Sequence, residues 1–458
     1  MDKNRTETQA GFRPEVTTGS EPTALQPDPF PAVETHPPNP QRWKTAAALL
    51  AAGGLLTACG GIGGGVYNGP FGTHEAAHLL RRATALGNSD DAAKLASLGV
   101  EKAVDYLLDQ PQLPPERDRD YFENDDMYVH EWTNHWLTSH TPAAERLTLF
   151  WHGHFVTEAA KVGDYMTYLK INKLRELSLG SFRDLLYMIA EDPAMIRYLD
   201  NDSSTKEHPN ENWARELMEL FTLGEGHYTE NDIKEVARAF TGWTAFWDDG
   251  LFYFTFDGRI HDFEPKQILG HEVYNRYTPI AEGYEVLDIL LGMDQTYKYI
   301  SQKLLHYYYR PDPDQAMINR GADILKGGTV RDFLKWLFTH PAFYEDETRN
   351  ALVKSPYEYA VGLFYAAGKR QVAEGENLDY RLRAYLDQDP YNPPNVAGWP
   401  IASTDWLTDS VLLQRLKFID FATSYPDGSE PAGPIDYGVF MDGAVNTLSL
   451  VAPEAQLL

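Results

Sequence analysis

Apolar side chains recur at helical spacing along most of the chain. From residue 71 onward this period of about 3.6 residues predicts helices. Further helix starts carry a capping side chain at Asp192, Thr229 and Ser355. The predicted helices lie roughly over residues 91–109, 142–151, 166–178, 211–223, 285–308, 331–338 and 408–421.

One stretch has a different pattern. LFYFTFDGRI, residues 251–260, is aromatic and β-branched, and its Asp257-Gly258 dipeptide favours a tight turn. We therefore expect a small β-hairpin there. The sequence predicts a predominantly α fold, with a single large helical domain over residues 71–425 and this hairpin as an insertion. Residues 426–458, rich in Pro and Gly, are expected to form a peripheral C-terminal tail.

The N-terminal segment resembles a lipoprotein signal. Arg42 and Lys44 precede an apolar run, residues 46–57, that is too short to span a bilayer. The run ends in LTACG, which resembles a bacterial lipobox, in which the cysteine is lipidated and becomes the mature N-terminus. We therefore predict a tail and signal over residues 1–58, lipidation of Cys59 and a Gly-rich tether over 59–70. The alternative is an incidental apolar helix with a buried cysteine.

The predicted signal has consequences for location. A lipidated protein would be exported and held in the cell envelope, facing the periplasm or the cell surface, and would meet the membrane through its lipid anchor only. The pattern departs from the usual one because 41 mostly polar residues precede Arg42. They are a cytoplasmic tail, or the start codon is misassigned.

Composition and charge narrow the function classes. The net charge of −27 argues against nucleic-acid partners, because binding phosphates requires clustered Lys and Arg. It argues equally against docking on anionic lipid through a basic face. The single cysteine excludes an internal disulfide, and its place in the lipobox excludes cysteine catalysis.

The string HEAAH, residues 74–78, matches the H-E-x-x-H pattern of zinc metalloproteases. On a helix this spacing places His74 and His78 on one face, with Glu75 as a general base. No clear third zinc ligand follows it. The protease interpretation therefore depends on a ligand from elsewhere in the chain.

The segment NENWARELMELFTLGEG, residues 210–226, is the most unusual in the chain. As a helix it places Asn212, Arg215, Glu216 and Glu219 in a stripe opposite its apolar face. The stripe is either an exposed face with ion pairs at i, i+4 spacing, or an acid/base or metal-binding pair formed by Glu216 and Glu219. Spacing alone leaves both open.

Histidines in two other segments are candidate metal ligands. His152 and His154 in LFWHGHFV could share a metal on an extended backbone, whereas a helical backbone would point them about 200° apart. The alternative is a pair of structural histidines at a helix end. His261-Asp262, just after the predicted hairpin, adds an imidazole and a carboxylate, although such a dipeptide is a weak signal by itself.

A proline-rich loop offers a different chemistry. PYNPPNVAGWP, residues 390–400, leaves little room for a helix. Asn395 and Trp399, with Trp406 following, could provide hydrogen bonds and a stacking surface for a sugar. The alternative is a buried structural loop.

Together these segments resemble the bacterial family called domain of unknown function 1800, over about residues 74–420. Its first motif begins at His78, so His74 and Glu75 lie outside it, which argues against the protease interpretation. The resemblance implies an exported protein without an assigned activity. Such proteins are often encoded beside a sulfatase-like family, domain of unknown function 1501, which suggests a partner. The matching pieces are AAHLLRRAT (76–84), FWHGHF (150–155), DPAMIRYLDN (192–201), residues 210–243, HDFEPKQILG (261–270), LVKSPYEYAVGLF (352–364) and PPNVAGWP (393–400).

Two functions of different classes follow. The first is a metal-assisted hydrolase that acts on an envelope or extracellular polymer, in which a divalent transition metal activates water and a carboxylate takes the proton. The metal ligands would be His152, His154, His261 and Asp262. The catalytic residues would be Glu216, Glu219 and Arg215, and Asn212 would bind the substrate.

The second is a non-catalytic lipoprotein that binds polysaccharide through Asn395 and Trp399, or that scaffolds the sulfatase-like partner. The two functions differ in geometry. A metal site requires His152, His154, Glu216 and His261 to bring their tips within about 5 Å of one point. In a scaffold these groups would be dispersed, each paired locally.

Overall fold

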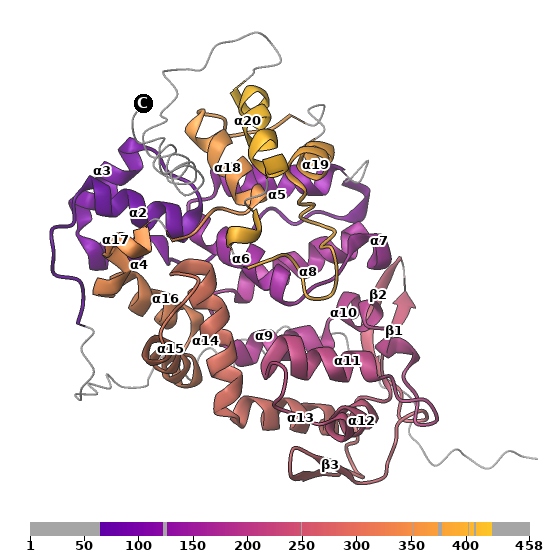
Figure 1. Cartoon of the computed structure of the whole chain (residues 1–458). Helices are drawn as coiled ribbons and strands as arrows, with labels where there is room; N and C mark the ends of the chain where they lie inside the picture. Colours follow the sequence, from indigo (N-terminus) through magenta and orange to yellow (C-terminus); the bar gives the residue numbers. More distant parts are fainter. Residues whose placement is uncertain are drawn as a thin grey trace, which may run out of the picture. The chain divides into compact units, whose positions relative to one another are not determined.

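Helices account for nearly all the regular structure in the computed structural model, which confirms a predominantly α fold (Figure 1). The structure describes residues 65–121, 126–248, 250–349, 351–373, 378–401, 403–406 and 409–423. The predicted lipidation site Cys59, the signal, most of the tether and the tail after residue 425 lie outside these residues.

The first helices run to the middle of the chain: α2 (Thr73–Thr84), α3 (Ser89–Leu98), α4 (Val100–Leu107), α5 (Asp126–Thr138), α6 (Pro142–His154), α7 (Ala159–Val162), α8 (Asp164–Leu177), α9 (Phe182–Glu191), α10 (Pro193–Tyr198), α11 (Glu211–Glu216) and α12 (Glu230–Ala239). The later helices are α13 (Ala281–Gly292), α14 (Asp294–Tyr308), α15 (Gln315–Gly327), α16 (Val330–Thr339), α17 (Asp346–Arg349), α18 (Pro356–Ala366), α19 (Leu378–Arg381) and α20 (Asp409–Thr423). Two π-helical segments, Leu217–Thr222 and Leu382–Leu386, follow α11 and α19 directly.

The predicted capping side chains begin their helices. Asp192 accepts a hydrogen bond from the Met195 N–H, and capping boxes built on Thr229 and Ser355 start α12 and α18. Two long helical patterns are each divided into two helices. Residues 91–109 break at Gly99, whose φ of +74° ends α3, and residues 285–308 break between α13 and α14.

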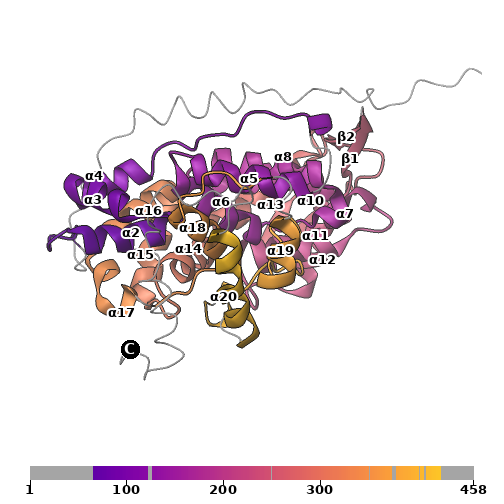
Figure 2. The same ribbon diagram turned by 90° about the horizontal axis from the view of Figure 1, so that it is seen from above.

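Two small antiparallel hairpins interrupt the helices. Strand β1 (Trp243–Asp248) pairs with β2 (Leu251–Phe256), from Trp243 opposite Phe256 to Asp248 opposite Leu251. The hairpin at 251–260 is thus present, but Asp257-Gly258 follows its second strand instead of forming its turn. Figures 1 and 2 place it beside α10, which contacts both strands.

The second hairpin was not predicted. Strand β3 (Lys266–Ile268) pairs with β4 (His271–Val273) through a turn at Leu269-Gly270. Both turn residues have positive φ, +48° and +83°, which suits a tight hairpin turn. Leucine rarely takes this conformation, so the sequence carried no turn signal there.

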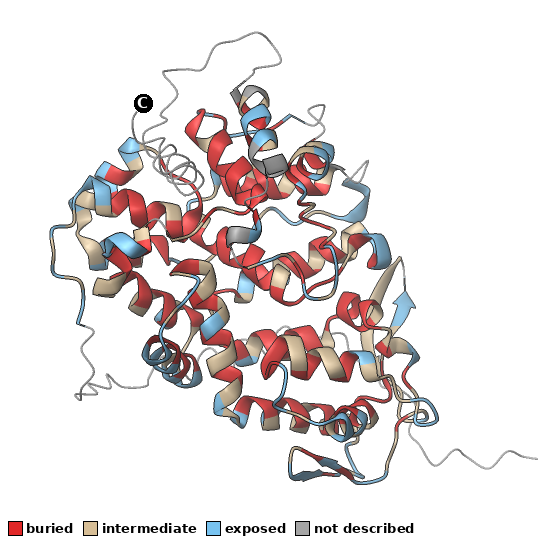
Figure 3. Ribbon diagram, in the orientation of Figure 1, coloured by how far each residue is buried: buried red, intermediate tan, exposed pale blue. Residues whose placement is uncertain are grey.

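Helix α6 lies at the centre of the described fold. Almost every residue from Ala143 to His154 is buried, whichever way its side chain points, as the burial colours show (Figure 3). Its side chains belong to both apolar core clusters: Leu147, Phe150 and Trp151 to the larger and Leu149 to the smaller. A helix that is buried all round must satisfy its polar side chains internally.

No helix within the described part of the chain is long and apolar enough to cross a bilayer.

Candidate functional site

The side chains of His74, Glu75 and His78 make contacts within the fold. His78 is fully buried on α2, and its Nε2 donates to the Phe343 carbonyl oxygen at 2.8 Å. Glu75 accepts from the Gly72 N–H at 3.0 Å and pairs with Arg349 at 3.1 Å. Exposed His74 also contacts Arg349. The glutamate thus helps to begin the helix and binds Arg349 of α17.

His152 and His154 follow the helical alternative. Because α6 continues to His154, the two imidazoles point to different neighbours. His152 Nε2 donates to the Pro390 carbonyl oxygen at 3.0 Å, and His154 Nε2 to the Phe221 carbonyl oxygen at 3.2 Å. His154 Nδ1 accepts from Lys303 Nζ at 2.9 Å. Since both His154 nitrogens are engaged, the extended backbone and shared metal do not hold for this pair.

Each histidine is held neutral by its surroundings. Burial lowers the pKa of His152 well below its ordinary value, and the nearby Lys170 adds to this effect. Burial and Lys303 do the same to the pKa of His154. The Phe221 carbonyl that His154 binds belongs to the π-helical segment at the end of the central motif. The imidazole thereby satisfies a carbonyl near a helix end.

The polar stripe of the central motif divides into exposed and half-buried groups. Arg215 binds both oxygens of Glu230, at 3.1 and 2.9 Å, and lies 3.7 Å from Glu211, so it follows the ion-pair alternative. Glu219 accepts from the Tyr228 hydroxyl at 2.6 Å. Burial, followed by the neighbouring Glu219, raises the pKa of half-buried Glu216.

Asn212 in the same stripe is exposed. Its backbone N–H donates to the side-chain oxygen of Asn210, the N-cap of α11, at 2.8 Å.

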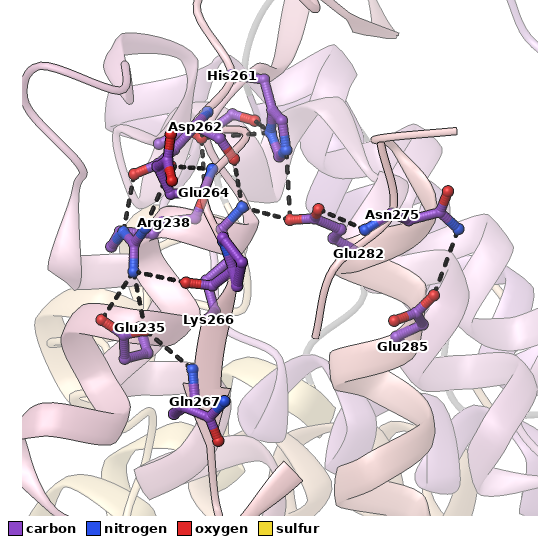
Figure 4. Close-up of polar contacts among 12 residues, drawn as sticks. Glu235, Arg238, His261, Asp262, Glu264, Lys266, Gln267, Asn275, Glu282 and Glu285 are labelled. Atoms are coloured by element: carbon purple, nitrogen blue, oxygen red, sulfur yellow. Dashed lines mark hydrogen bonds and ion pairs between the residues drawn. The ribbon is translucent and has the colours of Figure 1, made fainter. Parts of the chain in front are cut away.

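His261 and Asp262 belong to a buried network (Figure 4). His261 Nδ1 donates to the Thr241 carbonyl oxygen at 2.7 Å, and its Nε2 lies 3.4 Å from Glu282 Oε2. Lys266 Nζ contacts the same Glu282 oxygen, and all three side chains are fully buried. Burial raises the pKa of Glu282, but hydrogen bonds from His261 and Lys266 outweigh it and hold the pKa below its ordinary value.

Asp262 completes the network by binding Arg238 through both carboxylate oxygens, at 2.7 and 3.2 Å. Arg238 also pairs with Glu235 at 2.9 Å (Figure 4). Asp262 thus ties the segment after the β1–β2 hairpin to Arg238 of α12, which Glu235 holds from the same helix. The two residues predicted as metal ligands are engaged in fixing the fold.

The predicted metal ligands are therefore separated by the fold. In the described ranges no three His, Cys, Asp or Glu side chains are grouped closely enough to hold a metal ion. His152, His154 and the His261–Asp262 pair each bind different neighbours, and the charged groups near Glu216 are Glu219 and Arg215 of its own helical segment. Within these ranges the candidate ligands are dispersed instead of meeting at one point.

A cleft opens at the C-terminal end of α6. The space it encloses is small, about 40 Å³, well below the range of about 300–1,000 Å³ usual for small-molecule sites. Its lining comes from α6, α14, the start of α18 and the segment between α19 and α20. The lining residues are Leu149, Phe150, Gly153, His154, Tyr307, Ser355, Gln388, Trp399, Pro400, Ile401 and Trp406.

Two glycines bring the proline-rich loop onto α6. The Trp399 ring packs at 5.6 Å from the His152 ring, and a Cβ on Gly153 would lie 3.3 Å from Trp399 Cε3. Gly398 has a φ of +80°, and a Cβ there would collide with the Gly153 carbonyl oxygen. Gly153 and Gly398 thus allow Trp399 to form one wall of the cleft.

Few polar groups face this aromatic lining. The Tyr307 hydroxyl is held by Glu358 Oε1 at 2.7 Å, so mainly its ring is available to a ligand. The Gln388 amide oxygen accepts from the Tyr357 N–H at 2.8 Å, which leaves its amide nitrogen as a donor. An apolar pocket with a few placed polar groups is typical of a ligand site.

The sequence found part of this cleft. It predicted Trp399 and Trp406 as a stacking surface, and both line the cleft. Asn395 lies outside the lining and uses its side-chain oxygen to accept from the Ala397 N–H at 2.9 Å. Tyr307 and Lys303 were missed, although they share one helix face at i, i+4 spacing, a pattern that could have indicated them.

Comparisons with known proteins agree with the sequence motifs. The family model described as protein of unknown function (DUF1800) matches residues 78–452, and thus begins at the second histidine of HEAAH. No curated protein and no solved structure matches the chain. Pieces that carry the resemblance, residues 150–155, 352–364 and 393–400, all contribute to the cleft.

Proposed function

The chain belongs to the DUF1800 family, whose description assigns no activity, and we propose from the geometry of its cleft that it is an exported, lipid-anchored protein that binds glycan without cleaving it. One observation carries the proposal: Trp399, Trp406 and Tyr307 converge on a cleft whose polar groups are few. Aromatic faces suit the apolar faces of sugar rings, and they add large contact area at low entropic cost.

The dispersed polar groups support binding over catalysis. The histidines once considered as ligands each satisfy a carbonyl group in the fold. The half-buried Glu216 does not line the cleft, and Glu358, which contacts the lining residue Tyr307, is engaged by Tyr307 and Arg146. The lining, as far as the structure describes it, thus offers contact surface without a carboxylate to act as an acid or base.

The location and partner belong to the same proposal. Lipidation of Cys59 would hold the protein in the envelope, where polysaccharide is available. A sulfatase-like partner of the domain of unknown function 1501 family would then act on the glycan that this chain holds. The Cys59→Ser variant should leave the membrane fraction, and unchanged fractionation would contradict the anchor.

Glycan binding is tested with the full-length protein on an array of neutral, uronic-acid and sulfated oligosaccharides, followed by calorimetry on the best probe. Trp399→Ala should lower the affinity for that probe by about tenfold or more, as expected when a central aromatic contact is removed. Trp247→Ala is the matched control, because Trp247 is 59% exposed on β1, outside the cleft lining. Absence of binding to every probe, or equal affinity in Trp399→Ala, would overturn the proposal.

A further inference from the structure

Lys303 lies behind the cleft lining, where it contacts the lining residue His154, and it has no carboxylate partner among the described residues. It shares a face of α14 with the lining residue Tyr307, one turn away, and with Tyr299, whose ring centroid is 5.2 Å from Nζ. One of its three N–H groups binds His154 Nδ1, itself on the lining, at 2.9 Å. Among the residues that the structure describes, no ion pair involves Lys303, and burial lowers its pKa to about 8.

Two fully buried lysines of this chain are better compensated. Lys266 binds the Glu282 carboxylate. Lys170 binds the Phe155 carbonyl oxygen and the Thr157 hydroxyl, with the charge of Asp192 nearby. Lys303 has the neutral imidazole of His154 and the ring of Tyr299 as neighbours. A buried charge is ordinarily paired, so an uncompensated one beside a cleft indicates a missing counter-ion.

The region behind the cleft carries further positive charge. Arg146 pairs with Glu358 at 2.6 Å, and the same carboxylate attracts Arg82 and Lys354. Burial and neighbouring cations lower the pKa of Arg82 to about 9 and that of Lys354 to about 7, in spite of Glu358. Several cations thus share one carboxylate, in a chain whose net charge is −27. A local excess of positive charge favours an anion.

We infer that the cleft selects an acidic glycan, whose carboxylate or sulfate group becomes the counter-ion of Lys303. This inference rests on the proposed glycan binding. The sugar ring would lie against Trp399 and Tyr307, while its acidic group accepts the two remaining N–H groups of Lys303. A charge-assisted contact of this kind in a half-buried site is stronger than a neutral hydrogen bond.

The test compares the affinity of the full-length protein for three probes: a tetragalacturonate, its methyl ester, and a tetrasaccharide whose only charged group is one sulfate. The acid or the sulfate should bind about tenfold or more tightly than the ester, and the better of the two identifies the anion. Lys303→Met should abolish this preference and leave the affinity for the ester within about twofold, whereas Lys303→Arg should retain part of it. Lys298→Met, on the same helix, is the control and should change neither.

A pH series gives a second readout on the unmodified protein. As pH rises from 7 to 9 Lys303 loses its proton, so affinity for the acidic probe should fall while affinity for the ester stays constant. Equal binding of acid and ester, or a preference that persists in folded Lys303→Met, would overturn the anion preference and leave glycan binding intact. Binding of no probe at all would overturn both.

Discussion

Two lysines of this protein lie in contrasting surroundings, one fully buried and one partly buried. Lys266 pairs with Glu282, whose carboxylate lies between Lys266 and His261 (Figure 4). Lys303 lies beside the cleft, where its ammonium meets the neutral ring of His154. Both histidine neighbours belong to pieces of sequence that carry the family resemblance, residues 261–270 and 150–155.

The difference shows how one class of residue serves two purposes. The Lys266 network joins α12, β3 and α13, and has no charge left for a ligand. The charge of Lys303 is left uncompensated next to an open cavity. Polar residues in a family motif are therefore better judged by whether the fold satisfies them than by their type.

The largest expected effect is the loss of stability when Lys266, the lysine with a carboxylate partner, is replaced. Lys266→Met should lower the free energy of unfolding by about 3–5 kcal/mol, because it leaves Glu282 buried with one fewer partner. Urea denaturation at pH 7 measures it. Lys335→Met is the control: its lysine binds half-exposed Asp105 at the surface, so a loss of only about 0–1 kcal/mol is expected. A loss below about 1 kcal/mol in Lys266→Met would show that the network does not stabilise the fold.

The next effect concerns the wall of the cleft. Gly398→Ala should cost about 2–4 kcal/mol, the sum of backbone strain at positive φ and a clash with the Gly153 carbonyl. Gly270→Ala is a matched control, since its φ of +83° is equally strained but a Cβ there would meet open space. Thermal and urea unfolding would compare the two variants. Equal losses would mean that the loop does not press on α6, and that the cleft is wider than the structure shows.

Sequence periodicity and capping signals were sufficient for most helices, because those signals are local. Gly99 divided one predicted helix, and the turn at Leu269-Gly270 was missed, because neither result follows from an apolar pattern. The length of α6 had the greatest consequence for the site. Its predicted end at residue 151 left the backbone of His154 open, and the structure extends the helix through it. That extension separates the two imidazoles.

The candidate site was harder to predict than the fold, for a physical reason. Spacing indicates which side chains share a helix face, but not which carbonyl group or cation packs against that face in the folded protein. The sequence predicted His154 as a metal ligand, but its two ring nitrogens contact Phe221 and Lys303, which lie 67 and 149 residues away in the chain. Trp399 lines the cleft, in a proline-rich loop whose rigidity is a local property that the sequence shows, and its contact with a sugar stays a prediction.

The smallest expected effect is the change in stability when Lys303 is replaced, and it tests the comparison of the two lysines most directly. Lys303→Met should leave the free energy of unfolding at pH 7 unchanged or raise it, because removing an uncompensated buried charge relieves a desolvation cost. The pKa of Lys303 is about 8 in the folded protein and about 10.4 in an unfolded chain. Between these values the unfolded state binds more protons, so the unmodified protein should gain stability as pH rises from 8 to 10.

Lys303→Met lacks this titration, so its advantage should be greatest at pH 7 and shrink towards pH 10. Urea denaturation of both proteins at pH 7, 8.5 and 10 measures the difference, and Lys303→Arg, which keeps its charge throughout, should show no advantage at pH 7. If Lys303→Met were destabilised as strongly as Lys266→Met, the two lysines would have the same structural role. The charge beside the cleft would then be part of the framework, with no counter-ion to be supplied by a ligand.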